Sequence, residues 1–459
     1  MNDNSATETP RRRVILAGLV GNVMQWYDFA VYGYFATVIG RQFFPADNPS
    51  VSLIAAFGAF AAGFLVRPLG GLVFGRIGDL VGRQRAMTLS VLAMAAPTVL
   101  IGVLPTYEMI GVAAPIAIVL LRIVQGLSVG GDYTSSLVFL VEQAKPNRRA
   151  HMAIWGMWGA TAGILLGSAV GAAISSLLVD EQLIRWGWRL PFLFGVIVAG
   201  TGYLVRHGIH AKAPVGAGEN PVRDTFGKHR LAVLRVALLN VDLGVGFYAA
   251  FVYAVSYIQT VDKLEESIAL DLNTASMVVL LVALPLTAWL SDRYGRKPML
   301  IGGSAILTFG AIPLFHLMHT SAPETIVLGE FGFALAIALF AGGLVAANVE
   351  LMPDAIRCTR LAFAYNASIG IFGGVDARRD TLYRARVRLQ RLDRYFRRNH
   401  ALDGDLVDYK HRRSDLASLL GRHGRSSILA DGDLSRPRDA IQTAVLKFPF
   451  DRFSKPSPS

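Results

Sequence analysis

Apolar residues in this chain are grouped in long, nearly uninterrupted runs separated by short polar stretches. Most runs reach about 20 residues, the length a helix needs to cross a hydrocarbon layer roughly 30 Å thick. Backbone that is exposed to lipid has to satisfy its own hydrogen bonds, so each run is predicted to be a helix. The runs cover residues 14–40, 51–75, 86–104, 111–141, 151–178, 189–205, 231–259, 269–290, 298–318, 324–350 and 358–374. The pattern predicts an all-α polytopic membrane protein with about eleven spans.

Composition supports this class and excludes several others. The chain is 53% hydrophobic and 17% charged, whereas soluble domains carry about 25% charged residues. A single cysteine, Cys358, excludes an internal disulfide and offers no metal-ligand spacing. Neither a Walker-type phosphate loop nor a hydrolase motif is present. We therefore expect no enzyme, no catalytic residues, no metal and no cofactor.

The polar segment 206–230 divides the runs into two sets. Basic residues concentrate in the N-terminus, in this segment and in every second loop, which by the positive-inside tendency places them in the cytoplasm. A pair of helical sets with a site between them is typical of secondary transporters. The expected organisation is a cytoplasmic N-terminus at 1–13, a six-helix half at 14–205, a cytoplasmic linker at 206–230, a second half at 231–374 and a tail at 375–459.

One short motif, D-x-x-G-R, occurs once in each half. Asp79 and Arg83 form the first copy, and Asp292 and Arg296 the second, 213 residues further along. A repeat of this size indicates duplicated halves. We expect these charged groups to bond helix termini across the boundary between the halves and to act as a conformational latch. Asp79 is predicted near Arg357–Arg360, and Asp292 near the fifth helix.

A carboxylate lies in the middle of the first apolar run. Gln25, Asp28 and Tyr32 share one helical face. Because a charge at mid-bilayer is costly, a function is the default interpretation of Asp28, and a structural hydrogen bond to a neighbouring helix is the alternative.

The fourth run carries a second polar stripe with Arg122, Gln125 and Asp132. Arg122 and Asp28 lie at matching depths, so they are predicted to share one central cavity within reach of each other. An acid that gains and loses such a partner changes its proton affinity, as proton coupling requires. The alternative is a permanent ion pair that holds two helices together.

Two further features concern packing and solute binding. Glycines recur every fourth residue in the fifth run, which predicts close contact with a neighbouring helix; they are Gly159, Gly163, Gly167 and Gly171. Tyr248 in the seventh run is an aromatic candidate for lining a solute cavity.

Linked motifs from about Gly21 to Gly374 resemble the major facilitator superfamily, and within it the metabolite:proton symporter family. They are "QWYDFAVYGY", "RPLGGLVFGRIGDLVGRQR", "LRIVQGLSVGGDYTSS", "VEQAKPNRRA", "WGWRLPF", "LSDRYGRKP" and "ELMPDAIRCTRLAFAYNASIGIFGG". That family includes proline/betaine, α-ketoglutarate, citrate and shikimate carriers. It usually has Glu where Gln25 and Asp132 stand, Gly where Ala288 stands and commonly His where Arg76 stands. The change at Gln25 leaves Asp28 with more of the proton-carrying role.

The resemblance implies a two-half bundle in the bacterial inner membrane that moves a small organic acid or zwitterionic osmolyte together with protons. We expect Asp28 and Arg122 to couple to protons, and the solute to be bound by Gln25, Tyr32, Gln125, Asp132 and Tyr248. The expected partners are solute, protons and the lipid bilayer, with no nucleic acid and no second subunit.

The end of the chain departs from that family, which continues through a twelfth span. Residues 375–459 hold 19 Lys and Arg against 11 Asp and no Glu, and no run in them is long enough to span a membrane. We expect this tail to come from a shifted reading frame or an unrelated fusion and to be largely disordered. The alternative to a transporter is accordingly an inactive family member, at most a membrane scaffold or sensor.

Overall fold

The protein is described by a computed structural model that covers residues 11–206, 222, 225, 230–260, 266–319 and 323–369. The expectations for the tail at 375–459, and for most of the linker at 206–230, lie outside the described residues.

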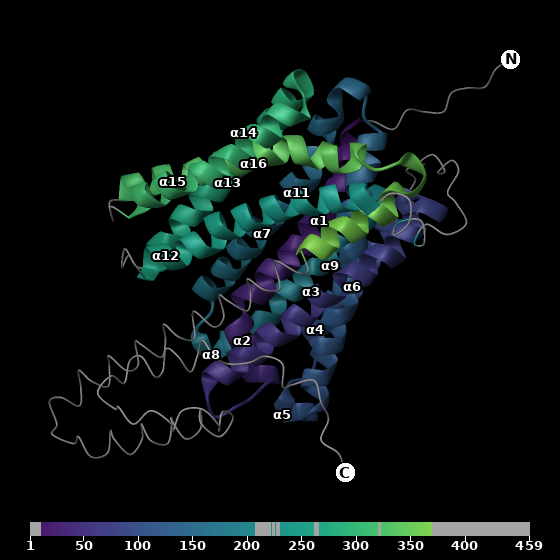
Figure 1. The fold of residues 1–459 in the computed structure, drawn as a ribbon. Coiled ribbons are helices and arrows are strands. Elements are labelled where there is room, and N and C mark those ends of the chain that lie inside the picture. The colour runs from purple at the N-terminus through teal and green to yellow at the C-terminus, as the bar shows by residue number, and fades with distance from the viewer. Residues whose placement is uncertain are drawn as a thin grey trace, which may run out of the picture. The chain divides into compact units, whose positions relative to one another are not determined.

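The first half is entirely helical in its described residues. Its long helices α1, α3, α4, α6, α7 and α9 correspond to the six predicted runs (Figure 1). The elements in chain order are α1 (Arg11–Tyr34), α2 (Ala36–Phe43), α3 (Pro49–Leu80), α4 (Arg83–Val103), α5 (Tyr107–Ile110), α6 (Ala113–Glu142), η1 (Pro146–Arg148), α7 (Arg149–Leu177), α8 (Asp180–Arg185), η2 (Gly187–Arg189) and α9 (Leu190–Arg206).

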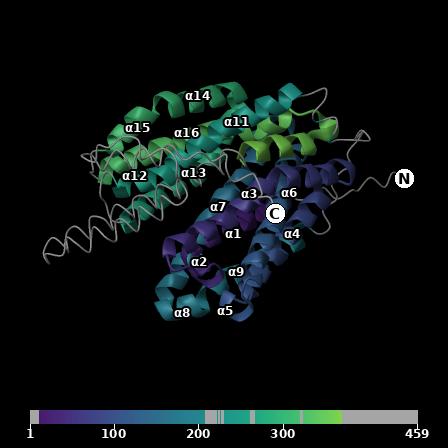
Figure 2. The same cartoon turned by 60° about the horizontal axis from the view of Figure 1, so that its bottom comes forward.

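The second half continues with helices of the same kind, which lie together in both views (Figures 1 and 2). They are α11 (Arg230–Tyr248), the π-helical turn η3 (Ala249–Tyr253), α12 (Ala254–Thr260), α13 (Glu266–Tyr294), α14 (Arg296–Phe309), α15 (Ala311–Met318), α16 (Pro323–Glu350) and the 3-10 turn η4 (Asp354–Ile356). A last helix occupies residues 357–369.

Nine of the described helices are long and apolar enough to cross a membrane, or ten if one bent pair forms a single span. The bent pair is α14 and α15, which meet at Gly310 at an angle of 51°. Pro313 lies in the first turn of α15 and has no N–H to donate to the carbonyl of Phe309, so the helix breaks there. The eleventh predicted run is described as a helix only to residue 369.

The glycine stripe of α7 packs against α1, as its spacing predicted. A Cβ on Gly159 would lie 2.8 Å from the carbonyl oxygen of Leu19, and one on Gly167 would lie 2.8 Å from that of Tyr27. Side chains larger than hydrogen would push the two helices apart. The small residues therefore set the separation of α1 and α7.

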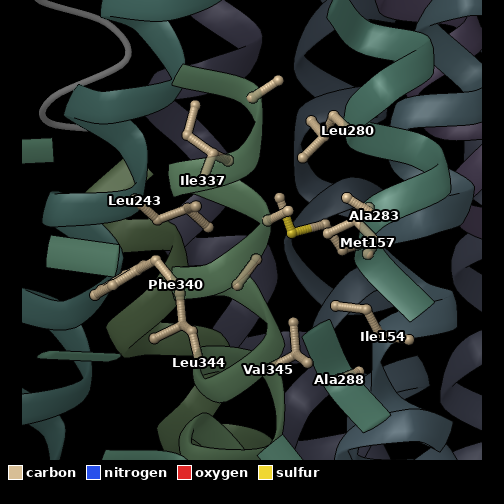
Figure 3. Packing of buried hydrophobic residues seen from close by; sticks show 14 of the residues in the cluster. Ile154, Met157, Leu243, Leu280, Ala283, Ala288, Ile337, Phe340, Leu344 and Val345 are labelled. Carbon is tan, nitrogen blue, oxygen red and sulfur yellow. The ribbon is translucent and has the colours of Figure 1, made fainter. Parts of the chain in front are cut away.

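The opposite face of α7 packs against the second half. Met157 of α7 lies beside Ala283 of α13, and Ile154 lies nearer to Ala288 of the same helix (Figure 3). The same apolar cluster extends to Phe340 of α16 and contains residues of both halves. The contact between the halves is therefore apolar where α7 meets α13.

Apolar side chains also cover surfaces that no part of the described chain packs on. On α3, Leu65, Leu69 and Val73 recur every four residues and are each more than half exposed. Gly63 and Gly70, on another face, contact the backbone of α6 closely. The pattern is that of a helix with one side against protein and one against lipid.

Candidate functional site

A buried ion pair connects α1 and α6 in the middle of the first half. The Arg122 Nη1 donates to Asp28 Oδ2 at 2.6 Å, and both side chains are almost completely buried. The matching depths in the two sequence stripes predicted this contact, and the structure confirms it. The contact is a charge-assisted hydrogen bond that is removed from water, and removing either partner would leave a buried charge without compensation.

The other oxygen of Asp28 is held by polar side chains from two more positions. Gln125 Nε2 donates to Asp28 Oδ1 at 3.0 Å, and the Thr98 hydroxyl of α4 lies 2.9 Å from the same oxygen. Gln125 and Thr98 are themselves 2.8 Å apart. Three helices thus converge on one carboxylate, and Gln125 lies at Asp28.

Tyr32 forms the wall behind Arg122. The guanidinium carbon of Arg122 lies 3.7 Å above the Tyr32 ring, a cation–π contact. The Tyr32 hydroxyl donates to the carbonyl oxygen of Ala56 at 2.9 Å, and its ring stacks on Phe60. Tyr32 therefore fixes the position of the arginine.

A second buried ion pair lies beyond the first on α6. Asp132 Oδ1 accepts from Arg206 Nη1 at 3.1 Å and lies 3.0 Å from the Ser90 hydroxyl. Arg206 also donates to the carbonyl oxygen of Ala17 at 2.9 Å. Asp132, expected at the solute site, is thus engaged by an arginine. Arg206, expected at the start of the linker, is the last residue of α9 and is 1% exposed.

Gln25 lies between the two ion pairs. It is buried, and no hydrogen-bond partner of its Oε1 exists in the described part of the chain. A crevice too narrow for a water molecule runs past it; its lining residues are Gly21, Met24, Gln25, Ser90, Val91, Met94, Ser128, Val129 and Asp132. Gln25 could therefore respond to a change in either pair.

Tyr248 is not brought to these ion pairs. It ends α11, directly before the π-helical turn η3, and its phenol interacts electrostatically with Arg67 of α3. Single π-helical turns are frequent at functional sites. The sequence reasoning missed Arg67 and Arg206, and also the hydroxyl residues Thr98 and Ser90. The signal for Arg67 was a lone arginine inside the apolar run 51–75.

The two D-x-x-G-R motifs make equivalent contacts at one end of the bundle. Asp79 accepts from the backbone N–H groups of Cys358 and Thr359 at 3.1 and 2.9 Å, and from the Thr359 hydroxyl at 2.7 Å. These groups begin the helix 357–369, so a carboxylate caps the positive end of a helix from the other half. The predicted position of Asp79 is confirmed.

Asp292 repeats the arrangement with the halves exchanged. It accepts from the backbone N–H groups of Ala150 and His151, at the start of α7, at 3.0 and 2.8 Å. The two motif arginines match as well. Arg83 donates to Gly78 O at 2.7 Å and pairs with Glu142 at 3.2 Å; Arg296 donates to Ser291 O at 2.9 Å and pairs with Glu350 at 3.0 Å.

The turns of both motifs have the same backbone geometry. Gly82 and Gly295, which are also 213 residues apart, have φ of 123° and 96°. Only glycine adopts this region without strain, and each residue precedes the next helix directly. Both the backbone geometry of the two motifs and the kind of partner that each contacts are therefore duplicated.

The fold and the site define a polytopic helical membrane protein of two related halves, with buried ion pairs inside the first half and paired acid–helix contacts between them. The chain belongs to the Major Facilitator Superfamily, whose family model matches residues 18–375.

Relatives of known activity cover most of the chain. A glycine betaine/proline/ectoine/pipecolic acid transporter, OusA of Dickeya dadantii, is 34% identical over 378 residues, 79% of this chain and 75% of that protein. The shikimate transporter of Escherichia coli is also 34% identical, over 79% of this chain and 85% of that protein. The chain is thus a multi-pass transporter related to proline/betaine and shikimate proton symporters.

Solved structures show the same fold. The proton:xylose symporter XylE bound to 6-bromo-6-deoxy-D-glucose superposes with a TM-score of 0.67 at 17% identity, covering 84% of this chain and 90% of that one. The human organic anion transporter MFSD10 superposes with a TM-score of 0.55 at 15% identity, covering 81% and 95%.

Proposed function

We propose that this protein is a proton-coupled symporter that carries a small organic acid or a zwitterionic osmolyte by alternating access. The observation that carries the proposal is the Asp28 carboxylate, fully buried and held by Arg122, Gln125 and Thr98 from two other helices. The family and its proline/betaine and shikimate relatives support the class of solute.

The chemistry follows from the arrangement of the pair. A proton on Asp28 removes the negative charge that holds Arg122, so the ion pair weakens. The contact between α1 and α6 is then less stable, and the two helices can move apart. Loss of the proton restores the pair. Asp28 therefore has two states that differ by several hydrogen bonds and one charge, which is the requirement for coupling a proton to a conformational change.

The Asp79 and Asp292 contacts supply the conformational element. Each connects the last turn of a helix of one half to the start of a helix of the other. They form when this end of the bundle is closed and break when it opens, so they bias the equilibrium between the two accessible states. The halves at 14–205 and 231–374 are the moving bodies, and we assign the motif end and the N-terminus to the cytoplasm.

Reconstituted protein tests the proposal. Proteoliposomes loaded with labelled proline, glycine betaine or shikimate should show counterflow. An imposed pH gradient, acid outside, should drive accumulation of up to about tenfold per pH unit for one proton per solute, because one unit is about 1.36 kcal/mol. Counterflow without pH-driven accumulation would exclude proton coupling. Absence of both would favour the inactive family member.

A further inference from the structure

The guanidinium of Arg67 is fully buried without an acid to pair with. Arg67 lies in the middle of α3 and is 0% exposed, and none of its three side-chain nitrogens has a hydrogen-bond partner in the described part of the chain. Three other buried arginines, Arg83, Arg122 and Arg206, each pair with a carboxylate. Arg67 differs from these three.

Aromatic rings surround this guanidinium. Its carbon lies 3.8 Å from the centre of the Phe64 ring and 4.6 Å from that of Phe29. The phenols of Tyr248 and Tyr365, from the second half, interact with it electrostatically. Ring faces offset part of the desolvation of a cation. They do not accept the five N–H groups of a guanidinium, which stays charged in proteins.

Arg67 also lies where the two halves meet. Its carbonyl oxygen is in the close contact between α3 and Gly130 of α6. One turn further, a Cβ on Gly71 would lie 2.9 Å from the carbonyl oxygen of Ala362, in the last helix. Asn366 of that helix donates to Gly130 O at 2.6 Å. The turns of α3 around Arg67 therefore contact both α6 and the second half.

We propose that Arg67 binds the carboxylate group of the transported solute. A guanidinium presents two parallel N–H groups that match the two oxygens of a carboxylate. The rings around it suit the apolar or cationic remainder of an organic acid or betaine. The inference rests on the proposed function, since it names the residue that recognises the solute of that symporter.

The position of Phe29 relates this site to the proton site. Phe29 contacts Arg67 through its ring, and the preceding residue, Asp28, holds Arg122. A carboxylate that draws Arg67 away from Phe29 therefore acts on the same turn of α1 that carries the protonatable acid. Solute and proton are coupled through adjacent residues of one helix.

Thermal unfolding of the full chain in detergent, followed with and without ligands, tests the assignment. The ligands are glycine betaine, proline and shikimate, with choline as the analogue that has the quaternary ammonium but no carboxylate. The variants are R67M and R67K. The matched control is R189M: Arg189 also lies over a ring, that of Trp188 at 4.6 Å, but its Nη1 donates to the carbonyl oxygens of Gly102 and Leu104.

We expect at least one carboxylate, and not choline, to raise the melting temperature of the unsubstituted protein. R67M should lose this rise while melting, without ligand, no lower than the unsubstituted protein, because an unpaired buried charge has been removed. R67K keeps the positive charge but loses the two parallel N–H groups of the guanidinium, so the affinity for the carboxylate ligand should fall about tenfold. Without ligand, R189M should melt at a lower temperature than the unsubstituted protein, and it should keep the ligand-induced rise in melting temperature.

Four results would overturn the assignment: a ligand-induced rise retained in R67M, an equal response to choline, no response to any carboxylate, or a ligand-free loss in R67M as large as in R189M. None of these measurements uses a proton gradient. Carboxylate binding that depends on Arg67 in a protein without pH-driven uptake would reject the symporter and leave the binding site in place.

Discussion

The two halves share their loops but not their interiors. The first half buries four charged side chains well inside its helices, Asp28, Arg67, Arg122 and Asp132, and a fifth, Arg206, at the end of α9. In the described residues of the second half, the charged side chains buried within helices are Glu330 of α16, which interacts with Ser276, and Arg360 of the helix 357–369. Elsewhere that half is filled by Ala, Leu, Val and Phe (Figure 3).

We interpret the duplicated contacts as elements of the conformational change and the unequal interiors as a sign that ligand chemistry is confined to one half. The Asp79 and Asp292 contacts are equivalent in the two halves, because an aspartate of each half caps a helix of the other. Under the proposed function, the buried charges of the first half would be the groups that bind the proton and the anionic group of the solute. A second half with an apolar core can move as a rigid body against it without breaking internal ion pairs.

The strongest test of this division compares the buried acids of the two halves. Asp28→Asn keeps an oxygen for Arg122 but cannot release a proton, so pH-driven accumulation should be abolished while solute exchange is partly retained. Glu330→Gln, in the second half, should keep accumulation. Uptake of labelled solute into proteoliposomes with and without a pH gradient measures both. Normal accumulation by D28N, or its loss in E330Q alone, would move the proton chemistry to the second half.

Stability should also respond unequally to the loss of a buried polar partner. Asp132→Ala leaves Arg206 without its acid and should cost about 3–5 kcal/mol. Asn348→Ala removes the neutral contact to Asn240, 3.0 Å in length, and should cost about 1 kcal/mol.

Melting temperatures in one detergent measure this difference. The double variant D132A/R206M, which removes both charges, should recover part of the loss. Equal losses in D132A and N348A would show that the buried charges of the first half contribute no more than neutral polar pairs.

Helix packing offers a third comparison, between two glycines. A Cβ on Gly163 of α7 would meet the carbonyl oxygen of Val23, which is rigid backbone, whereas one on Gly302 of α14 would lie 3.4 Å from a flexible Leu339 methyl. Gly163→Ala should cost about 1–3 kcal/mol, and Gly302→Ala should stay within about 0.5 kcal/mol. Thermal unfolding of the two variants decides; a tolerant Gly163 would mean that α1 and α7 are not held at a fixed separation.

The smallest expected effect distinguishes the two latches. Asp79 is 0% exposed and accepts from three donors of the other half, whereas Asp292 is 6% exposed and accepts from two donors of the other half. Removing about 1 kcal/mol of such capping raises the open population roughly fivefold. D79N should therefore increase the population in which the end of the bundle with the D-x-x-G-R motifs is open, and it should do so more than D292N.

The chain carries its own reporter for this opening. Cys358 is buried, is the single cysteine of the sequence, and its N–H donates to Asp79. Its rate of modification by a maleimide should rise in both variants and more in D79N. A faster rate in D292N than in D79N would reverse the assigned strengths, and an unchanged rate in both would remove the latch role.

Several features of this protein follow from the sequence because they depend on local periodicity and depth. The length of the apolar runs predicted the helices. The matching positions of Asp28 and Arg122 predicted their contact, and the duplicated motif predicted the partners of Asp79 and Asp292. Each of these is determined by where a residue stands along a helix that must cross a layer of known thickness.

Other features depend on how neighbouring helices are rotated and spaced, which no single run encodes. Asp132 pairs with Arg206, a partner that the sequence did not predict, because α9 continues one residue beyond its apolar run and packs beside α1 and α4. Tyr248 lies at Arg67, not at Asp28, because helices of the two halves meet there. Pairing partners, and the arginine left without one, were decided only by tertiary packing, since a side chain's neighbours across a bundle depend on every helix around it.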